Sequence, residues 1–402
     1  MSVSDRTAIW FLAFGQTLVW AGTYYIFPAL IVRWEAELGW SRSEITGALT
    51  IAILTSAILS PVSGRLIDKG LGALTLTLGA FVGGWLVAAL FFVESLAGFY
   101  AIWAGLGVCM AFALYEPCFA FVIRTKGLDA KRFITLITLV AGFASTVSFP
   151  VAHVLSDEFG WRISLIAFVC MVSFVGAPLM YFGAKNLTPH ESALKSIEET
   201  AQIQGRGRYG FLLWPKFWLI ALALMLLSMV HATLINHLLL LLKDRQISAD
   251  TAVLAASFMG PMQVFGRLLA TLVERYFSNG MLTALCYIFS ISAVGALMLA
   301  EKLPAMLAIF IILQGSGIGV SSIMKPVLSR EILGGENFGL KSGAQAVPFF
   351  TGNAFAALIG SLLWALGGYD LVLKVLILLL MVGFFALLAA IHLNRAADTK
   401  GG

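Results

Sequence analysis

Three charged side chains interrupt long apolar runs of this sequence, and their types define the chemistry that the chain can offer. They are Glu116, Arg267 and Lys325. A charge inside a membrane-spanning segment is costly unless it is paired or faces a water-filled cavity, so we expect each of them to serve a function. A guanidinium and an ammonium bind anions, whereas a carboxylate carries a proton or pairs with a cation. The three residues therefore point to anion binding and proton coupling.

Arg267 has the side chain best suited to grip an anion. It lies eight residues before Arg275, and at a rise of 1.5 Å per residue this spacing places it about 12 Å into the membrane. That depth is too great for the side chain to reach the interface easily. Its planar fork can hold a carboxylate through two parallel hydrogen bonds. A structural ion pair is the alternative role.

Glu116 and Lys325 occupy corresponding places in an internal repeat, residues 105–117 and 315–326. Each follows a Gly-x-Gly pattern by eight or nine residues and directly precedes a proline. A proline removes a backbone hydrogen bond and frees the carbonyl four residues earlier, so we expect a kink at each place. Such breaks commonly border substrate sites. Kinks that serve only packing are the alternative.

Uncharged polar groups within apolar runs supply further candidates for substrate binding. His231, Asn236 and His237 share one aliphatic run; both histidines can donate hydrogen bonds to an anion or titrate near neutral pH, and a packing role is an equal alternative for each. Tyr24 is the polar member of a helical face that it shares with Trp20 and Phe27, a face that lines a cavity or serves only helix packing. Lesser candidates are Tyr115, Gln314, Gln345, Asn353 and His153.

The composition excludes a water-soluble globular protein. The 402 residues are 60% hydrophobic and 12% charged, with a mean hydropathy of +0.93, whereas soluble chains carry about 25% charge. The apolar runs approach the roughly 20 residues that a helix needs to cross about 30 Å of hydrocarbon. They do not alternate as barrel strands would. We therefore predict an all-α membrane protein.

Polar breaks separate twelve apolar runs, and the longest break divides them six and six. The predicted spans are residues 8–32, 44–62, 71–93, 97–123, 133–155, 161–183, 217–242, 250–273, 281–300, 303–328, 342–366 and 371–393. This arrangement predicts two pseudo-symmetric six-helix bundles, residues 1–183 and 216–402, joined by a linker, residues 184–215.

The basic residues predict how the chain is oriented. With the N-terminus inside, most of the 26 Lys and Arg fall in cytoplasmic loops, which is the bias of the positive-inside rule. Both termini and the linker are therefore predicted to lie in the cytoplasm, and the protein in the cell inner membrane. The same bias explains most of the net charge of +5, so the basic balance does not indicate nucleic-acid binding.

Residues 64–72, GRLIDKGLG, follow the second predicted span. This segment resembles the loop 2–3 signature of the major facilitator superfamily, and with the twelve spans in two halves the resemblance covers the whole chain. It implies that Gly64, Asp68 and Lys69 form a conformational latch at the cytoplasmic end, where a carboxylate can face a helix N-terminus or a basic partner. The basic pair usual at the end of this signature is replaced here by Ala73 and Leu74, which predicts a weaker latch.

Four features resemble the bacterial branch of this superfamily that is related to monocarboxylate porters. They are residues 39–42 (GWSR), residues 160–162 (GWR), His237 seven residues before Asp244, and Arg267. In that branch an arginine of helix 8 binds the carboxylate, so the resemblance implies this role for Arg267. A Gly-Pro motif in helix 5, typical of drug and proton antiporters, is not visible, which counts against drug efflux.

The resemblance also gives Glu116 and Lys325 a joint role. In the facilitator fold, helices 4 and 10 face one another across the cavity, which implies that these two side chains meet when the cytoplasmic side closes. We therefore hypothesise a gate in which Glu116 alternates between a proton-loaded and an ion-paired state. A permanent structural pair is the alternative.

No enzyme constellation is visible in the sequence. There is no Gly-rich phosphate loop of the Gly-Lys-Ser/Thr type and no metal-ligand spacing, and the four cysteines lie in apolar runs without paired spacing. We expect no cofactor and no metal.

The leading prediction is a secondary transporter that moves a small organic anion, with a monocarboxylate favoured, together with a proton by alternating access. Its partners are then the anion, the proton and the lipid bilayer, and a monomer suffices because one chain holds both halves. An exporter of an amphipathic metabolite or drug in exchange for protons is the alternative. A third class, an intramembrane enzyme or a receptor, lacks a catalytic grouping and long cytoplasmic domains.

Overall fold

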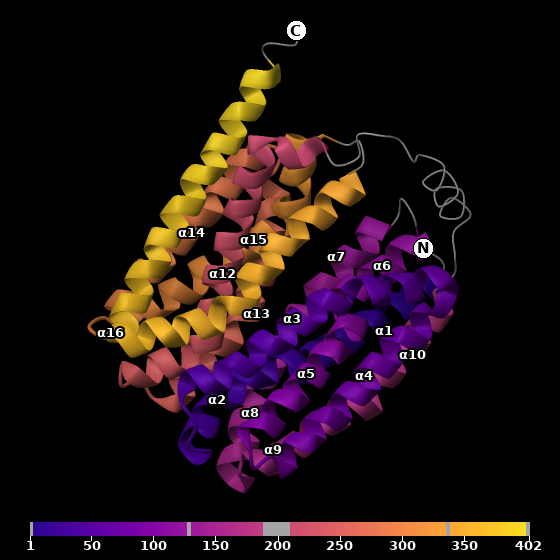
Figure 1. Ribbon diagram of the computed structural model, residues 1–402, viewed down its shortest axis with the longest axis vertical. Coiled ribbons are helices and arrows are strands. Elements are labelled where there is room, and N and C mark those ends of the chain that lie inside the picture. Colours follow the sequence, from indigo (N-terminus) through magenta and orange to yellow (C-terminus); the bar gives the residue numbers. More distant parts are fainter. Residues whose placement is uncertain (1–2, 127–129, 188–209, 335–337, 399–402) are drawn as a thin grey trace. The chain divides into compact units, whose positions relative to one another are not determined.

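The protein folds into two helical bundles. The computed structural model describes residues 3–126, 130–187, 210–334 and 338–398, and the chain divides into two compact units, Met1–Gln204 and Gly205–Gly402. Both units are built from helices (Figure 1). Most of the predicted linker, residues 184–215, lies outside the described residues.

The structure confirms the predicted fold of twelve membrane-spanning helices, six in each bundle. Ten helical segments of the described chain are long and apolar enough to cross a membrane. The last of them, Ala344–Arg395, contains two spans, because its backbone bends at Gly367 and Gly368. Gly368 has a φ of +65°, a conformation that glycine adopts without steric cost. The first helical segment, residues 3–37, completes the twelve.

The N-terminal bundle contains six spans, several of which are built from more than one helical piece. In chain order these pieces are α1 (Val3–Trp20), η1 (Ala21–Tyr25), α2 (Ile26–Glu37), α3 (Arg42–Leu66), η2 (Ile67–Leu71), α4 (Gly72–Ala89), η3 (Leu90–Phe92), α5 (Leu96–Ala113), α6 (Tyr115–Lys126), α7 (Ala130–Ala141), α8 (Ala144–Phe159), α9 (Trp161–Val169), η5 (Cys170–Gly176) and α10 (Ala177–Asn186). Three of the pieces, η1, η2 and η5, are π-helical.

The C-terminal bundle has longer and more regular helices. They are η6 (Gly210–Leu213), α12 (Pro215–Asp244), α13 (Ala249–Val273), α14 (Asn279–Leu299), α15 (Ala305–Leu333) and α16 (Phe338–Asp398). Within this bundle α12 packs against α16, and α15 packs against both α13 and α14. Figure 1 shows the two halves of α16 as a V that meets at the bend.

An aromatic cluster forms part of the core of the N-terminal bundle. Phe27, Trp34, Phe99, Trp103 and Trp161 are at most 1% exposed. Their ring centroids lie between 4.8 and 6.2 Å apart, and most pairs meet edge to face. This is the geometry that aromatic pairs prefer. Phe27, predicted to share a face with Tyr24, therefore belongs to the packed core.

The GWSR segment, residues 39–42, begins α3. Ser41 caps the helix in a capping box, because its Oγ accepts from the backbone N–H of Glu44 and the Glu44 carboxylate accepts from the backbone N–H of Ser41. Such boxes satisfy two helix-end donors at once. The next residue, Arg42, forms an ion pair with Glu35 of α2 at 2.9 Å. These contacts fix the turn between α2 and α3.

The GWR segment, residues 160–162, begins α9 in the same bundle. Trp161 donates from Nε1 to Glu37 at 2.8 Å, and Arg162 donates from Nε to the Phe91 carbonyl at 3.2 Å. Both segments that suggested the monocarboxylate-porter branch therefore make contacts between helix ends. Their contacts explain the fold rather than the choice of substrate.

Small residues let corresponding helix pairs approach closely in both bundles. A Cβ at Gly107 of α5 would lie 2.2 Å from the Ala52 carbonyl of α3, and a Cβ at Gly266 of α13 would lie 2.3 Å from the Ser316 carbonyl of α15. Glycines at interfaces of this kind are typical of packed membrane helices. Gly266 also sets the position of its neighbour Arg267 against α15.

Replacing Gly107 with Ala is expected to lower the free energy of unfolding by at least about 1 kcal/mol, because overpacking forces two backbones apart. Gly295 of α14 is the matched control, since a Cβ there meets nothing within 4 Å. Gly295→Ala should raise stability by about 0.5–1 kcal/mol, because it stiffens the unfolded chain. Unfolding of both variants in a denaturing detergent titration tests this contrast, and equal effects would contradict it.

Candidate functional site

The C-terminal bundle contains a partly open cavity of about 130 Å³ that is lined by α12, α15 and α16. Its residues recur at spacings of three or four along each helix, so each helix presents one face to it. The lining residues are Leu224, Leu227, Ser228, His231, Ile318, Ser321, Ser322, Lys325, Phe349 and Asn353. Three of them, His231, Lys325 and Asn353, are site residues that the sequence predicted, and the fold brings them together.

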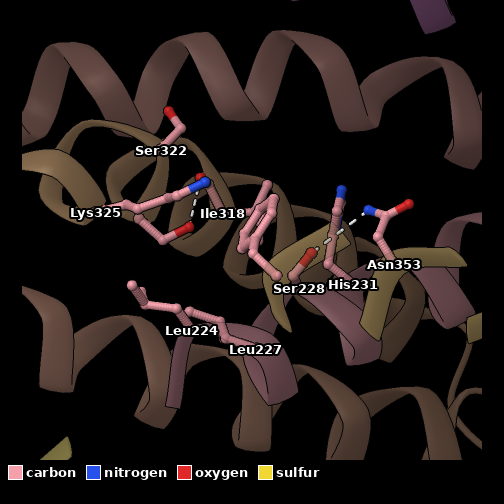
Figure 2. Close-up of a pocket in the computed structure, with 10 residues that line it drawn as sticks. Leu224, Leu227, Ser228, His231, Ile318, Ser322, Lys325 and Asn353 are labelled. Atoms are coloured by element: carbon pink, nitrogen blue, oxygen red, sulfur yellow. Dashed lines mark hydrogen bonds between the residues drawn. The ribbon is translucent and has the colours of Figure 1, made fainter. Parts of the chain in front are cut away.

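The cavity combines one cation with several hydrogen-bonding groups. The Lys325 ammonium lies 3.4 Å from the centroid of the Phe349 ring, a cation–π contact. Asn353 donates from its amide to the Ser228 hydroxyl at 3.4 Å. Nδ1 of His231 is buried and has no hydrogen-bond partner among the described residues. Figure 2 shows Lys325 to one side of the cavity and His231 and Asn353 to the other.

Arg267 lies behind the cavity wall. Its side chain is buried, with 7% exposure, and its Nε donates to the hydroxyl of Ser322 at 3.2 Å. Ser322 lines the cavity and in turn donates to the Gly319 carbonyl of its own helix at 2.7 Å. Arg267 therefore adds positive charge one side chain away from the cavity. Lys325 is the cation that lines it.

His237 links two helices inside the C-terminal bundle. Its Nε2 donates to the Ala357 carbonyl at 2.8 Å, because a carbonyl can only accept, and its Nδ1 lies 3.0 Å from the Tyr369 hydroxyl. Neighbouring Asn236 donates to the Ala232 carbonyl of its own helix at 2.8 Å. Neither residue lines the cavity. The geometry at His237 matches the packing role.

Gln314 is fully buried on α15, and neither atom of its amide has a hydrogen-bond partner within the described chain. It lies four residues before Ile318 and eleven before Lys325, which places it on the helix face that lines the cavity, one turn further on. Gln345 is also buried, at 3% exposure. Unsatisfied buried amides are unusual in native proteins, where they often mark a water or functional site.

In the N-terminal bundle the helix of the fourth span is interrupted next to Pro117, where the sequence predicted a kink. α5 ends at Ala113, Leu114 adopts an extended conformation with ψ of −160°, and α6 begins at Tyr115. Pro117 cannot donate a hydrogen bond to the Ala113 carbonyl. The side chain of Gln16 on α1 donates to that carbonyl instead, at 2.7 Å. Gln16 was not predicted from the sequence.

The break places Tyr115 and Glu116 in the first turn of α6. Glu116 is exposed, and Tyr115 is partly exposed and contacts the ring of Trp20 at 4.7 Å. Tyr24, predicted on the same face as Trp20, lies 5.3 Å from it within the π-helical segment η1. Tyr24 and Tyr115, both predicted from the sequence, therefore both contact the ring of Trp20.

The second proline does not produce a corresponding break. α15 continues through position 326 as one helix from Ala305 to Leu333, so the helix is not interrupted there as the fourth span is at Leu114. Glu116 belongs to the N-terminal unit and Lys325 to the C-terminal unit. The gate between them stays a prediction.

The predicted latch segment forms a tight π-helical turn between α3 and α4. Gly70 has a φ of +84°, which explains a glycine at this position. Arg124 of α6 donates to the Ile67 carbonyl and so ties the turn to the fourth span. Gly64 lies in the last turn of α3, and Lys69 is exposed. The side chain of Asp68 lies outside the described residues, so its role as a latch stays a prediction.

Several cavity residues were missed although helical spacing pointed to them. Ser228 lies three residues before His231, and Ser321 and Ser322 lie four and three before Lys325. Among the described residues there is no cluster of His, Cys, Asp or Glu that would hold a metal ion. The Lys325 ammonium and the serine hydroxyls of the lining are groups that can bind a small polar ligand.

The fold is similar to that of a solved transporter. A bacterial homolog of the human lysosomal transporter Spinster, solved in an inward-facing and unoccupied conformation, matches with a TM-score of 0.68 over 98% of both chains at 12% identity. At this identity the likeness shows the fold alone.

Curated relatives match part of the sequence. The Multidrug resistance protein MdtH of Aeromonas hydrophila is 32% identical over 153 residues, which cover 35% of this chain and 36% of that protein. The protein of the same name from Aeromonas salmonicida matches to the same extent. The matched segment thus spans about a third of the length of these relatives.

The family model of the Major Facilitator Superfamily matches residues 12–302. That range covers well over half of the chain and includes the latch segment, the break in the fourth span and Arg267. The chain therefore belongs to the major facilitator superfamily of membrane transporters.

Proposed function

We propose that the protein moves a small organic anion, with a monocarboxylate favoured, across the cytoplasmic membrane by alternating access. The cavity beside Lys325 carries this proposal, because it combines a cation, hydrogen-bond donors and an apolar wall. Pockets for small ligands have this composition of mostly apolar lining with a few placed polar groups. The cavity would hold the anion while the transporter changes conformation.

The size and lining of the cavity favour a short carboxylic acid. Its volume of about 130 Å³ is slightly below that of an engineered protein cavity of about 150 Å³ that binds benzene. A carboxylate would pair with Lys325, and Asn353 and His231 offer further hydrogen-bonding groups. The carbon chain would rest against Leu224 and Leu227. Arg267 would strengthen the positive potential from behind Ser322.

Glu116 is the proposed proton carrier. It is an exposed carboxylate in the first turn of α6, directly after the break in the fourth span. A change of conformation at this break would move the carboxylate between different surroundings, so that its protonation follows the conformation. We propose that Glu116 exchanges its proton for an ion pair with Lys325 as the transporter cycles, with both termini in the cytoplasm.

Uptake into proteoliposomes tests this proposal. Vesicles that contain the purified protein should accumulate labelled propionate or lactate when the outside is made acidic, and Glu116→Gln should make uptake independent of the proton gradient. Empty vesicles under the same gradient control for passive entry of the protonated acid. Uptake equal to that of empty vesicles would contradict the anion proposal, and unchanged proton coupling in Glu116→Gln would remove its proton role.

Export of an amphipathic compound in exchange for protons is the second candidate. The names of the two Aeromonas relatives favour it. In that case Glu116 alone would carry the proton. Proteoliposomes with an acidic interior would then take up a cationic dye such as ethidium in exchange for the protons that leave. Propionate would show no carrier-dependent flux.

A further inference from the structure

One end of the C-terminal bundle carries an exposed aromatic ring with two ammonium groups beside it. Trp214 directly precedes α12 and is 39% exposed. The Nζ atoms of Lys216 and Lys341 lie 5.3 Å and 5.1 Å from the centroid of its ring, and both distances are typical of cation–π contacts. These three residues are called the Trp214 cluster below. Two positive charges therefore share one ring that the surroundings can reach.

The packing of helix ends positions both lysines. Lys216, in the first turn of α12, donates from Nζ to the side chain of Asn394 at 3.0 Å, near the end of α16. Lys341, in the first turn of α16, donates from Nζ to the Leu333 carbonyl at 2.6 Å, at the end of α15. Both ends of α16 point away from its bend (Figure 1). The fold thus gathers three helices around Trp214.

Both ammonium groups have donors left for an anion. An ammonium carries three N–H donors, and each lysine uses one of them, for an uncharged oxygen. Within the described ranges neither lysine forms an ion pair with a carboxylate. Like charges beside one ring repel each other, and an anion that contacts both would offset this repulsion. The chemistry of the cluster therefore favours an anionic group such as a phosphate.

Exposed apolar side chains adjoin the cluster. Leu213 is 86% exposed and Trp218 is 55% exposed. The Nε1 of Trp218 donates to the Leu212 carbonyl at 2.8 Å and so ties the turn before α12 to the helix. The spanning helix α12 begins at Pro215, so these side chains lie near the membrane interface, where tryptophans are enriched. A ligand that pairs with the two lysines and also covers this apolar surface is an anionic amphiphile.

We infer that the Trp214 cluster binds the phosphate of an anionic phospholipid, whose acyl chains lie against Leu213 and Trp218. The basic residues predict that this end of the bundle faces the cytoplasm, where anionic lipids attract lysines next to membrane helices. The cluster shares no residue with the lining of the anion cavity. Lipid binding here therefore does not depend on what the protein transports.

Dioleoylphosphatidylglycerol and dioleoylphosphatidylcholine form a matched pair of probes, because they carry the same acyl chains and only the first has a net charge. Native mass spectrometry of the purified full-length protein, titrated with each lipid in a neutral detergent, gives the dissociation constant of the first bound lipid. Phosphatidylglycerol should bind about tenfold more tightly, because each basic side chain near an anionic headgroup raises the affinity several-fold. Equal affinities for the two lipids would overturn the inference.

Glycerol 3-phosphate distinguishes a lipid site from a site for free phosphate esters, because it carries the charged group without acyl chains. It should bind the native protein far more weakly than phosphatidylglycerol does, since it cannot cover Leu213 and Trp218. Binding as tight as that of the lipid, and lost in Lys216→Gln, would overturn the inference in favour of a free phosphate ester.

Substitutions locate the binding. Lys216→Gln combined with Lys341→Gln should remove the preference for phosphatidylglycerol, and Arg at both positions should keep it. The control combines Lys302→Gln with Lys374→Gln, which removes the same two charges from exposed lysines outside the cluster. Lys302 precedes the start of α15, whereas the cluster adjoins the end of that helix. The control should keep the preference; an equal loss in both double variants, or a loss in neither, would overturn the inference.

A single substitution keeps the test decisive if the double variant does not fold. Lys341 is 6% exposed and bonds the end of α15, whereas Lys216 is partly exposed. Lys216→Gln alone should reduce the preference for phosphatidylglycerol about threefold or more, because it removes one of the two cations. An unchanged preference in folded Lys216→Gln protein would overturn the inference.

Discussion

Replacing Lys325 with Gln is expected to weaken the binding of propionate by about 10- to 100-fold, because a hydrogen bond to a charged group contributes about 1.5–3 kcal/mol. Lys325 is the cation that lines the cavity in the C-terminal bundle. Initial rates of uptake into proteoliposomes over a range of propionate concentrations measure the effect as a rise in KM. Lys325→Arg should weaken propionate binding less than Lys325→Gln does, since arginine keeps the positive charge and changes only the shape of the donor.

Lys374 supplies the control for this experiment. It lies on α16 in the same bundle, is exposed, and does not line the cavity. Lys374→Gln removes the same charge and should leave the KM for propionate unchanged. If both variants raised KM equally, the effect would come from the net charge of the protein. If neither did, Lys325 would not bind the anion.

Replacing Gln16 with Leu is expected to lower the free energy of unfolding by about 2–3 kcal/mol, because it leaves a buried carbonyl without a donor. Gln16 is 0% exposed and donates to the Ala113 carbonyl at 2.7 Å. That carbonyl needs a side-chain donor because Pro117 supplies none. Unfolding in a denaturing detergent titration measures the loss.

A double-mutant cycle isolates the interaction. Pro117→Ala restores a backbone N–H that can bond the Ala113 carbonyl, so Gln16→Leu should cost far less in the Pro117→Ala background than in the native sequence. The coupling energy between the two substitutions should be about 1–2 kcal/mol. Additive effects would show that Gln16 stabilises the bundle by some other contact.

The course of the chain through the membrane followed from hydropathy alone. The predicted runs 342–366 and 371–393 end and begin on either side of the bend at Gly367 and Gly368. Such breaks can be predicted because glycines and polar residues interrupt long apolar runs. The break at Leu114 could also be predicted, since Pro117 lies four residues after Ala113, whose carbonyl it leaves without a backbone donor.

The direction in which each polar side chain points was harder to predict. The sequence placed Arg267 at depth, but it did not reveal that Ser322 stands between its guanidinium and the cavity. Likewise, His231 and His237 share one apolar run, and from the sequence alone both had the same two possible roles. The hydrogen-bonding partners of His237, Ala357 and Tyr369, identify it as a packing residue. Contacts between helices depend on how the helices rotate and pack, which the spacing within one helix does not specify.

The most direct test of the account is a structure of the protein determined with 2-bromopropionate, in which anomalous scattering locates the bromine. We predict one strong peak within the cavity between α12, α15 and α16, with the carboxylate within hydrogen-bonding distance of the Lys325 ammonium and the bromine toward Leu224 and Leu227. The peak should be absent in Lys325→Gln. An empty cavity at saturating 2-bromopropionate, or a peak that remains in Lys325→Gln, would contradict the assignment of this cavity as the anion site.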